Sequence, residues 1–178
     1  MKRTLGFIFA ALLAGNAMAF DLTSPDVKMG HPMGEEQEYK GFGCKGGNLS
    51  PELNWKGAPA GTLSYAVTVY DPDAPTGSGW WHWVVYDIPA SASGLPGGAV
   101  VKAALPAGAK QGRNDYGDRN FGGACPPAGD KPHHYIFTVY ALKVAKLDVP
   151  EDASPALIGF MLHANRIGLA KLTATYSR

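Results

Sequence analysis

The sequence is poor in the features that mark several large classes of protein. It has two cysteines in 178 residues and a formal net charge of +1, with 16 Lys and Arg residues against 15 Asp and Glu residues. Because the basic residues form no cluster, the chain lacks the electrostatic footprint of a nucleic-acid-binding protein, and charge does not favour a membrane surface. Beyond the N-terminal segment, no apolar run is long enough to cross a bilayer. No serine lies in a G-x-S-x-G pattern, which argues against that type of hydrolase.

The N-terminal segment has the order of features found in a secretory signal peptide. Lys2 and Arg3 precede a short apolar run, and an A-x-A cleavage pattern ends at Ala19. We interpret residues 1–19 as a signal peptide, in preference to a buried N-terminal helix. Residues 20–178 are then expected to form a single domain with its own core, located in the periplasm or secreted.

The two cysteines, Cys44 and Cys125, are candidates for one disulfide. Both lie in Gly-rich loops, and an exported protein folds in an oxidising compartment. The bridge would close a loop of about eighty residues, for which the chain-entropy treatment gives roughly 4 kcal/mol of stabilisation. The alternative is two separate buried thiols. No neighbouring charge marks either residue as a nucleophile.

The pattern of apolar residues predicts a mainly β domain of antiparallel strands with one or two short peripheral helices. Alternating or β-branched runs predict strands at 64–70, 81–88, 135–142 and 169–176, and more weakly at 20–27 and 53–55. Loops of the length found between these strands usually carry a site or are held by a cross-link. The long loops are expected at 28–52, 71–80 and 104–132.

One helix is predicted to begin at Pro155, with Ser154 as its N-cap. Apolar residues follow at helical spacing, and we interpret this stripe as core packing. The stripe consists of Leu157, Phe160, Met161, Ala164 and Ile167.

The segment from Asp71 to Trp83 has the strongest functional pattern in the chain. It reads D-P-D-A-P-T-G-S-G-W-W-H-W, with two carboxylates between prolines, a flexible turn, and a histidine among tryptophans. An aromatic cluster beside fixed polar groups is typical of a small, dry binding pocket. Asp71 follows a predicted strand and His82 opens the next one. Strand alternation predicts that Trp81 and Trp83 share one face as core or interface residues, which leaves Trp80 for the pocket.

A second run of residues is expected to form the other wall of the pocket. His133 and Tyr135 open a later strand, after a long loop that contains Pro126 and Pro127. If the strand ends are neighbours, two imidazoles, one carboxylate and one phenol converge, and an imidazole held by aspartate is a good donor to phosphate. The same residue types would suit a two-His-one-carboxylate metal site, but no metal-ligand spacing supports one. We therefore expect neither a metal nor a cofactor.

The D-P-D-x-P and P-P…H-x-Y motifs together resemble the phosphatidylethanolamine-binding protein family, which includes the Raf kinase inhibitor proteins. The bacterial exported branch is the most similar. The resemblance extends from Phe20 to the last predicted strand, and includes the segments 50–55 and 112–117. It implies an antiparallel β sandwich with Greek-key connections and a small pocket for phosphate, acetate or a phosphoethanolamine head group. The ligand-binding residues that it implies are Asp71, Pro75, Trp80, His82, Pro126, Pro127, His133 and Tyr135.

The resemblance also implies a role for the polar residues. His82 and His133 are expected to donate hydrogen bonds to the anion, and Asp71 to orient one of the two imidazoles and set its tautomer. Asp73 is expected to support the loop, by pairing with a neighbour or by accepting from backbone N–H groups. The tryptophan and the prolines would form an apolar wall.

The sequence departs from the eukaryotic members around the expected pocket rim. His134 stands where those proteins tend to have arginine, and the loop after Pro75 is short. We also expect the eukaryotic C-terminal helix beside the pocket to be missing. Because the partner surfaces of the eukaryotic proteins lie around this rim, the differences argue against kinase binding.

Three hypotheses of function follow. The first is an exported, non-enzymatic protein that binds a small anionic ligand, with a phospholipid head group among the candidates. The second is an inhibitor or modulator of a partner protein that acts through the pocket rim. The third is a hydrolase of a small ester or phosphoester, for which no nucleophile motif is present. A homodimer with tryptophans at its interface suits the bacterial resemblance.

Overall fold

The computed structural model describes residues 19–178, so the predicted signal peptide lies outside the described residues except for Ala19. The described chain is mainly β, with three sheets and one α-helix. Its helical elements are η1, a 3-10 helix (Glu35–Gln37), and α1 (Pro155–Asn165). Its strands are β1 (Asp21–Thr23), β2 (Lys40–Gly41), β3 (Cys44–Lys45), β4 (Leu53–Lys56), β5 (Ser64–Asp71), β6 (Trp80–Pro89), β7 (Gly94–Leu95), β8 (Lys110–Gln111), β9 (His133–Leu142) and β10 (Arg166–Tyr176).

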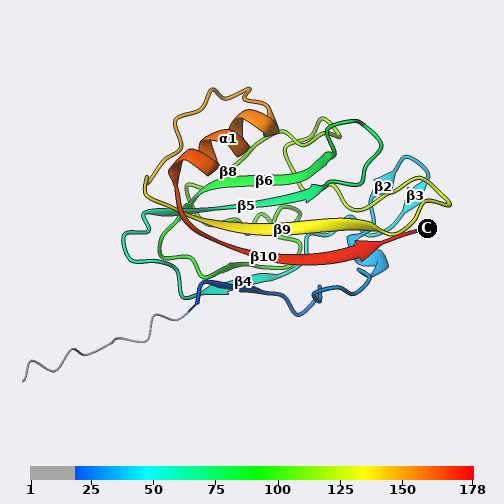
Figure 1. Ribbon diagram of the computed structural model, residues 1–178, viewed down its shortest axis with the longest axis horizontal. Helices are drawn as coiled ribbons and strands as arrows, with labels where there is room; N and C mark the ends of the chain where they lie inside the picture. The colour runs from blue at the N-terminus through cyan, green and yellow to red at the C-terminus, as the bar shows by residue number, and fades with distance from the viewer. Residues whose placement is uncertain (1–18) are drawn as a thin grey trace, which may run out of the picture.

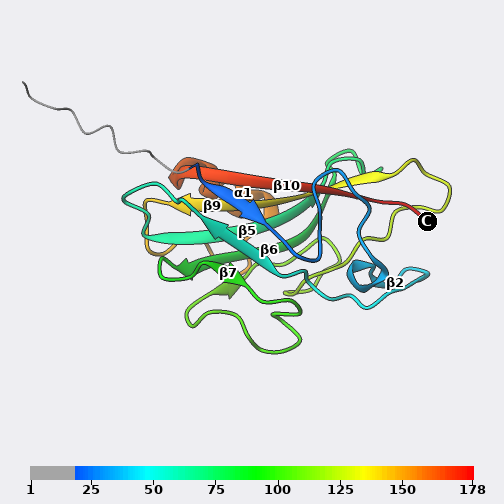
Figure 2. The same ribbon diagram turned by 90° about the horizontal axis from the view of Figure 1, so that it is seen from below.

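The strands form two layers that pack face to face. The larger sheet has five antiparallel strands in the order β10-β9-β5-β6-β8, and the smaller has the order β1-β4-β7. Figure 1 shows α1 on one side of the larger sheet and β4 on the other, and Figure 2 shows the blue strand β1 in front of the long strands. The mainly β architecture and the strands expected from alternation are therefore confirmed.

The main core fills the space between the two sheets because alternate residues of each long strand point inward. This is clearest in β9, where His133, Tyr135, Phe137 and Val139 are buried in turn. His133 and Tyr135 are the first two residues of this inward-facing row, at one end of the sheet, and the residues that follow them in the row belong to the core. The same alternation that builds the core therefore positions two of the predicted site residues.

The helix has the predicted start but not the predicted buried face. The Ser154 side chain accepts a hydrogen bond from the Leu157 backbone N–H at 3.2 Å, as an N-cap should. The buried residues are Ile158 and Leu162, whereas Leu157 and Phe160 of the predicted stripe are exposed. Of the other stripe members, Met161 is half-buried, Ala164 is exposed, and Ile167 belongs to β10. The predicted stripe was wrong because apolar side chains surround most of this helix and do not mark one face.

The prediction that Trp81 and Trp83 share a face was also wrong. Trp83 is buried between the two sheets, while Trp81 packs with the cluster beneath α1. Val69 pairs with Trp83, but its neighbour Tyr70 pairs with Trp81, so the register shifts by one residue between them. A β-bulge of this kind breaks the two-residue period and turns the side chains on either side of it to opposite faces.

A hairpin and a disulfide close the end of the sandwich where the site residues gather. Strands β2 and β3 pair around the two-residue tip Phe42-Gly43, and both tip residues have positive φ, 52° and 86°. Cys44 in β3 is bonded to Cys125, with their Cα atoms 6.0 Å apart. The predicted bridge is present and ties the hairpin to the long loop before β9. No helix within residues 19–178 is long and apolar enough to cross a membrane.

Candidate ligand pocket

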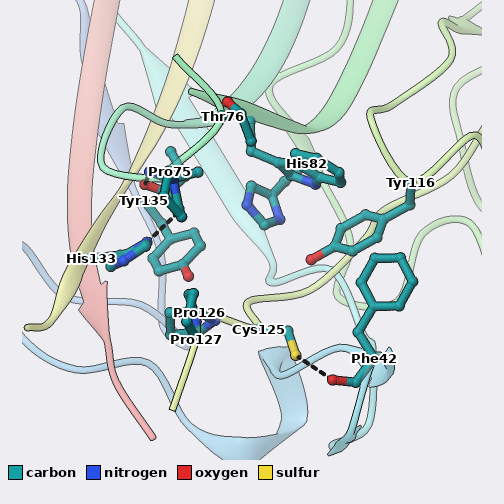
Figure 3. A pocket seen from close by; sticks show the side chains of 13 residues that line it. Phe42, Pro75, Thr76, His82, Tyr116, Cys125, Pro126, Pro127, His133 and Tyr135 are labelled. Carbon is teal, nitrogen blue, oxygen red and sulfur yellow. Dashed lines mark hydrogen bonds and ion pairs between the residues drawn. The ribbon is translucent and has the colours of Figure 1, made fainter. Parts of the chain in front are cut away.

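A cavity of about 170 Å3 lies at the end of the sandwich, beside the disulfide. Every residue that the sequence assigns to the ligand pocket lines it, and Figure 3 shows the rings of His82, Tyr116 and Tyr135 around the shared space. The predicted lining residues are Asp71, Pro75, Trp80, His82, Pro126, Pro127, His133 and Tyr135. Residues 62 positions apart thus meet in one site, and their role in binding stays a prediction.

Asp71 organises one wall of the cavity. Its side chain is 2 % exposed, and its Oδ1 accepts hydrogen bonds from the backbone N–H groups of Asp73 at 2.8 Å and Ala74 at 3.2 Å. Its Oδ2 accepts from Nδ1 of His133 at 2.8 Å. The single carboxylate therefore fixes both the turn after β5 and the imidazole at the start of β9.

His133 lies between two carboxylates. Nδ1 donates to Asp71, and Nε2 is 3.4 Å from Oδ2 of Asp130. Burial alone would lower the pKa of His133, but the hydrogen bond and negative charge of Asp71, aided by Asp130, outweigh burial and raise it. Of the two predicted imidazoles, His133 is the one that Asp71 orients.

Asp73 supports the turn in both of the ways considered from the sequence. Its Oδ2 accepts from the His134 backbone N–H and from Nδ1 of the His134 ring, each at 2.7 Å. Partial burial would raise the pKa of Asp73, but these hydrogen bonds and the charge of His134 lower it. Asp73 does not line the cavity; it joins the turn after β5 to the start of β9 from outside.

His82 is held by a different set of partners and has different chemistry. It is 2 % exposed, and its Nδ1 donates to the carbonyl oxygens of Gly122 at 2.8 Å and Gly123 at 3.1 Å. Burial lowers the pKa of His82 to about 4, against the opposing effects of these carbonyls and of Asp71. The ring is therefore neutral at pH 7 with its proton on Nδ1, so Nε2 is an acceptor. Donation from His82 to an anion stays a prediction, and it would require a proton on Nε2 that this neutral form does not carry.

Three buried polar atoms of the lining have no hydrogen-bond partner among residues 19–178. They are Nε1 of Trp80, Nε2 of His82 and the hydroxyl oxygen of Tyr135. Burial, with a contribution from the charge of Asp71, raises the pKa of Tyr135, so its hydroxyl stays protonated and can donate. The residues that line the cavity thus bring two unpartnered donors and one unpartnered acceptor.

Several lining residues were missed at the sequence level. Tyr116 stacks on Tyr39 with ring centroids 3.9 Å apart and donates from its hydroxyl to Gly123 O at 3.0 Å. Phe42 is at the hairpin tip, and the centroid of its ring lies 5.5 Å from that of Tyr116. The other missed residues are Ala74, Thr76 and Cys125. The sequence did point to Cys125 through the disulfide, but the positions of Tyr116 and Phe42 depend on how the long loops fold back.

The Pro126 side of the cavity is joined to Arg178. Nε of Arg178 donates to Pro126 O at 2.6 Å, and the Gly129 N–H donates to Arg178 O at 3.2 Å. Within residues 19–178, no group of three or more His, Cys, Asp or Glu side chains is arranged to hold a metal ion.

The matches to known proteins agree with this geometry. Residues 23–177 match the model of the family described as phosphatidylethanolamine-binding protein. The chain belongs to this family. The resemblance inferred from the two spaced motifs is therefore confirmed.

Two bacterial relatives match this family member over most of both chains. UPF0098 protein YbcL of Escherichia coli is 55 % identical over 165 residues, which cover 92 % of this chain and 90 % of YbcL. UPF0098 protein YbhB of the same organism is 46 % identical over 157 residues, covering 88 % of this chain and 99 % of YbhB. The crystal structure of E. coli YbcL superposes with a TM-score of 0.87, covering 89 % of this chain and 98 % of that one.

A relative from Mycobacterium tuberculosis, LppC, is named as a candidate lipoprotein. It is 38 % identical over 136 residues, which cover 76 % of this chain and 63 % of LppC. The family membership and these matches make the chain a binding protein of the phosphatidylethanolamine-binding type.

Proposed function

We propose that the chain is an exported, non-enzymatic binding protein whose cavity takes a small phosphate- or carboxylate-bearing ligand. A phosphoethanolamine-like head group is one member of this class. The family membership supports binding as the general role. The similarity to LppC, named as a candidate lipoprotein, supports a location in the cell envelope, as the predicted signal peptide does.

The observation that carries the proposal is the set of unpartnered polar atoms around the cavity. A buried donor or acceptor that lacks a hydrogen bond destabilises a protein by about 1–3 kcal/mol. Trp80, His82 and Tyr135 each contribute one such atom to the same lining. A small ligand with acceptor oxygens and one hydroxyl would satisfy all three at once, whereas an apolar ligand would satisfy none.

The engaged polar groups and the size of the cavity favour a small ligand. Asp71, which raises the pKa of His133, is already engaged by three donors. Pro75, Pro126 and Pro127 contribute apolar surface to the lining. A volume of about 170 Å3 suits a head group and is small beside the clefts that bury drug-sized molecules.

The test is a phosphorus NMR titration of phosphoethanolamine with the protein. We expect wild type to shift and broaden the phosphorus resonance, and His82→Ala and His133→Ala each to weaken binding by at least about tenfold, because each loses a buried hydrogen-bonding group. His163→Ala is the matched control, since His163 is an exposed histidine on α1. Circular dichroism shows whether each variant is folded. Absence of binding by wild type, or full binding by both folded pocket variants, would overturn the proposal.

A further inference from the structure

The orientation of the His82 ring limits what its free nitrogen can bind. Nδ1 faces two carbonyl oxygens, which only accept, so this nitrogen must carry the proton. The carbonyls cannot easily turn away. The N–H groups in the same peptide planes are both engaged. The Gly123 N–H donates to Oδ1 of Asn48 at 2.7 Å, and the Ala124 N–H donates to Gln37 O at 3.0 Å. The loop and the ring therefore hold each other in one arrangement, with Nε2 left for the cavity.

The neighbours of the ring do not provide a donor to Nε2. The charged and titratable groups that face it are Asp71 from β5, His133 and Tyr135 from β9, and Tyr116 from the long loop. The proton of His133 Nδ1 goes to Asp71, and the Tyr116 hydroxyl donates to Gly123. Both tyrosine rings lie steeply inclined to the imidazole, at 68° for Tyr116 and 71° for Tyr135, with ring centroids 5.6 Å and 5.0 Å away. Within the described residues, Nε2 stays a buried acceptor with no partner.

We propose, building on the function above, that the pocket binds its anion together with one proton shared between His82 Nε2 and a ligand oxygen, and so selects phosphate monoesters over phosphodiesters. A monoester carries a P–OH group in its singly charged form, with a second pKa near 6, and this hydroxyl donates to Nε2. Its other oxygens accept from the Trp80 and Tyr135 donors. A phosphodiester has no proton, so one of its oxygens would meet the lone pair of Nε2.

A diester could be accommodated only by protonating His82 itself. With a pKa of about 4, the ring is in its charged form in about one molecule per thousand at pH 7. A site built to hydrogen-bond a hydroxyl rejects an analogue without it because its own buried group is left unpaired. The inference therefore places free phosphate monoesters, and not the diester linkage of an intact phospholipid, as the ligand class.

The test compares methyl phosphate with dimethyl phosphate by phosphorus NMR titration. At pH 5.5 both are mainly singly charged, and neither has an ammonium group that could itself donate to Nε2. We expect methyl phosphate to bind at least about tenfold more tightly. We also expect its dissociation constant to rise about tenfold per pH unit above pH 7, because one proton must be taken up.

His82→Gln provides the matched variant, since its amide does not titrate and can offer either an N–H or a carbonyl. We expect it to lose most of the discrimination and the pH slope. If this variant does not fold, nitrogen NMR of wild-type His82 gives the same answer. Nε2 should have the shift of an unprotonated nitrogen in the free protein at pH 7, and of a hydrogen-bonded or protonated nitrogen with methyl phosphate.

The outcomes separate this inference from the function on which it rests. Equal binding of the two esters, with affinity independent of pH between 5.5 and 8, would overturn proton-linked selection and leave anion binding in place. If neither ester nor phosphoethanolamine binds, both proposals fail. An Nε2 that is already protonated in the free protein at pH 7 would also overturn the inference.

Discussion

At the scale of single residues, Asp71 connects more of the site than any neighbour in the D-P-D-A-P segment. It accepts two backbone hydrogen bonds that shape the turn and one from His133 that orients the ring. Because Asp71 and Asp130 raise the folded-state pKa of His133 above its ordinary value of 6.5, the stabilisation from the charged ring has a defined pH window. It is complete below about pH 6.5 and is lost as the pH rises through the folded-state pKa.

Asp71→Asn should therefore lower the pKa of His133, which proton NMR of the ring can follow. The free energy of unfolding at pH 6 should fall by about 2 kcal/mol, because a hydrogen bond between two charged groups is lost. The difference from wild type should shrink at pH values above the folded-state pKa of wild-type His133, where the ring is neutral. Urea unfolding at several pH values measures this.

Asp130→Asn is the control for that substitution. The Asp130 side chain is 43 % exposed and lies 3.4 Å from His133, so solvent screens the pair and its removal should lower the pKa of His133 much less. Equal effects of the two substitutions, or no change in the titration of His133 in Asp71→Asn, would contradict the assigned role of Asp71.

The residue identities of the site were predictable, but their hydrogen-bonding states were not. The segments 71–83 and 126–135 together named eight residues that line the cavity, because each segment contains the end of a strand with clear alternation. The state of His82 depends on the carbonyls of Gly122 and Gly123, which lie 40 and 41 positions away. No local pattern shows where a distant carbonyl will point, so the neutral acceptor form emerged only from the folded structure.

At the scale of elements, long strands were predicted well and short ones were not. Strands β5, β6, β9 and β10 have eight or more residues and carry their own alternation. Two-residue strands such as β2 and β8 exist only because a partner lies beside them, so the sequence holds no signal for them. The buried face of α1 was mispredicted for a related reason, since its burial is decided by the sheet beneath it.

The β2–β3 hairpin has a feature that invites a direct test. Phe42 is a bulky residue at φ 52°, a conformation that favours glycine or asparagine, and 70 % of it is exposed. Strained backbone conformations cluster at functional sites. Because Phe42 lines the cavity, we infer that its side chain contributes to ligand binding. Phe42→Asn should leave the free energy of unfolding within about 0.5 kcal/mol of wild type or raise it. It should weaken phosphoethanolamine binding by about three- to tenfold, through lost apolar contact.

Phe160→Asn is the matched control for this test, because Phe160 is 67 % exposed and lies on α1, outside the cavity lining. Its ligand affinity should equal that of wild type. If the two variants bind equally well, or if Phe42→Asn unfolds the protein, Phe42 is not the ligand wall that we infer.

At the scale of the whole molecule, the Cys44–Cys125 bond joins chain segments 81 residues apart. Cys125 lines the cavity, and Cys44 belongs to the hairpin that carries Phe42. Reduction should lower the free energy of unfolding by about 4 kcal/mol, because the unfolded chain regains the freedom that the closed loop removes. Reduction should also weaken ligand binding, because the hairpin that carries Phe42 is no longer bonded to the loop that carries Cys125. Urea unfolding and phosphorus NMR, with and without reductant, measure both effects.

The double variant Cys44→Ser, Cys125→Ser separates the bond from other effects of the reductant. Its stability should match that of the reduced wild type and should not respond to reductant. A wild type whose unfolding midpoint and ligand affinity survive reduction unchanged would show that the hairpin is held by its aromatic contacts instead.

The contact of Arg178 with Pro126 has a practical consequence for each of these experiments. A peptide joined after Arg178 would leave the protein next to Pro126, a lining residue whose carbonyl oxygen accepts from the guanidinium group. An affinity tag there would compete for space with the ligand and add its own charges. A fluorophore at the same place would instead report occupancy without any substitution inside the pocket.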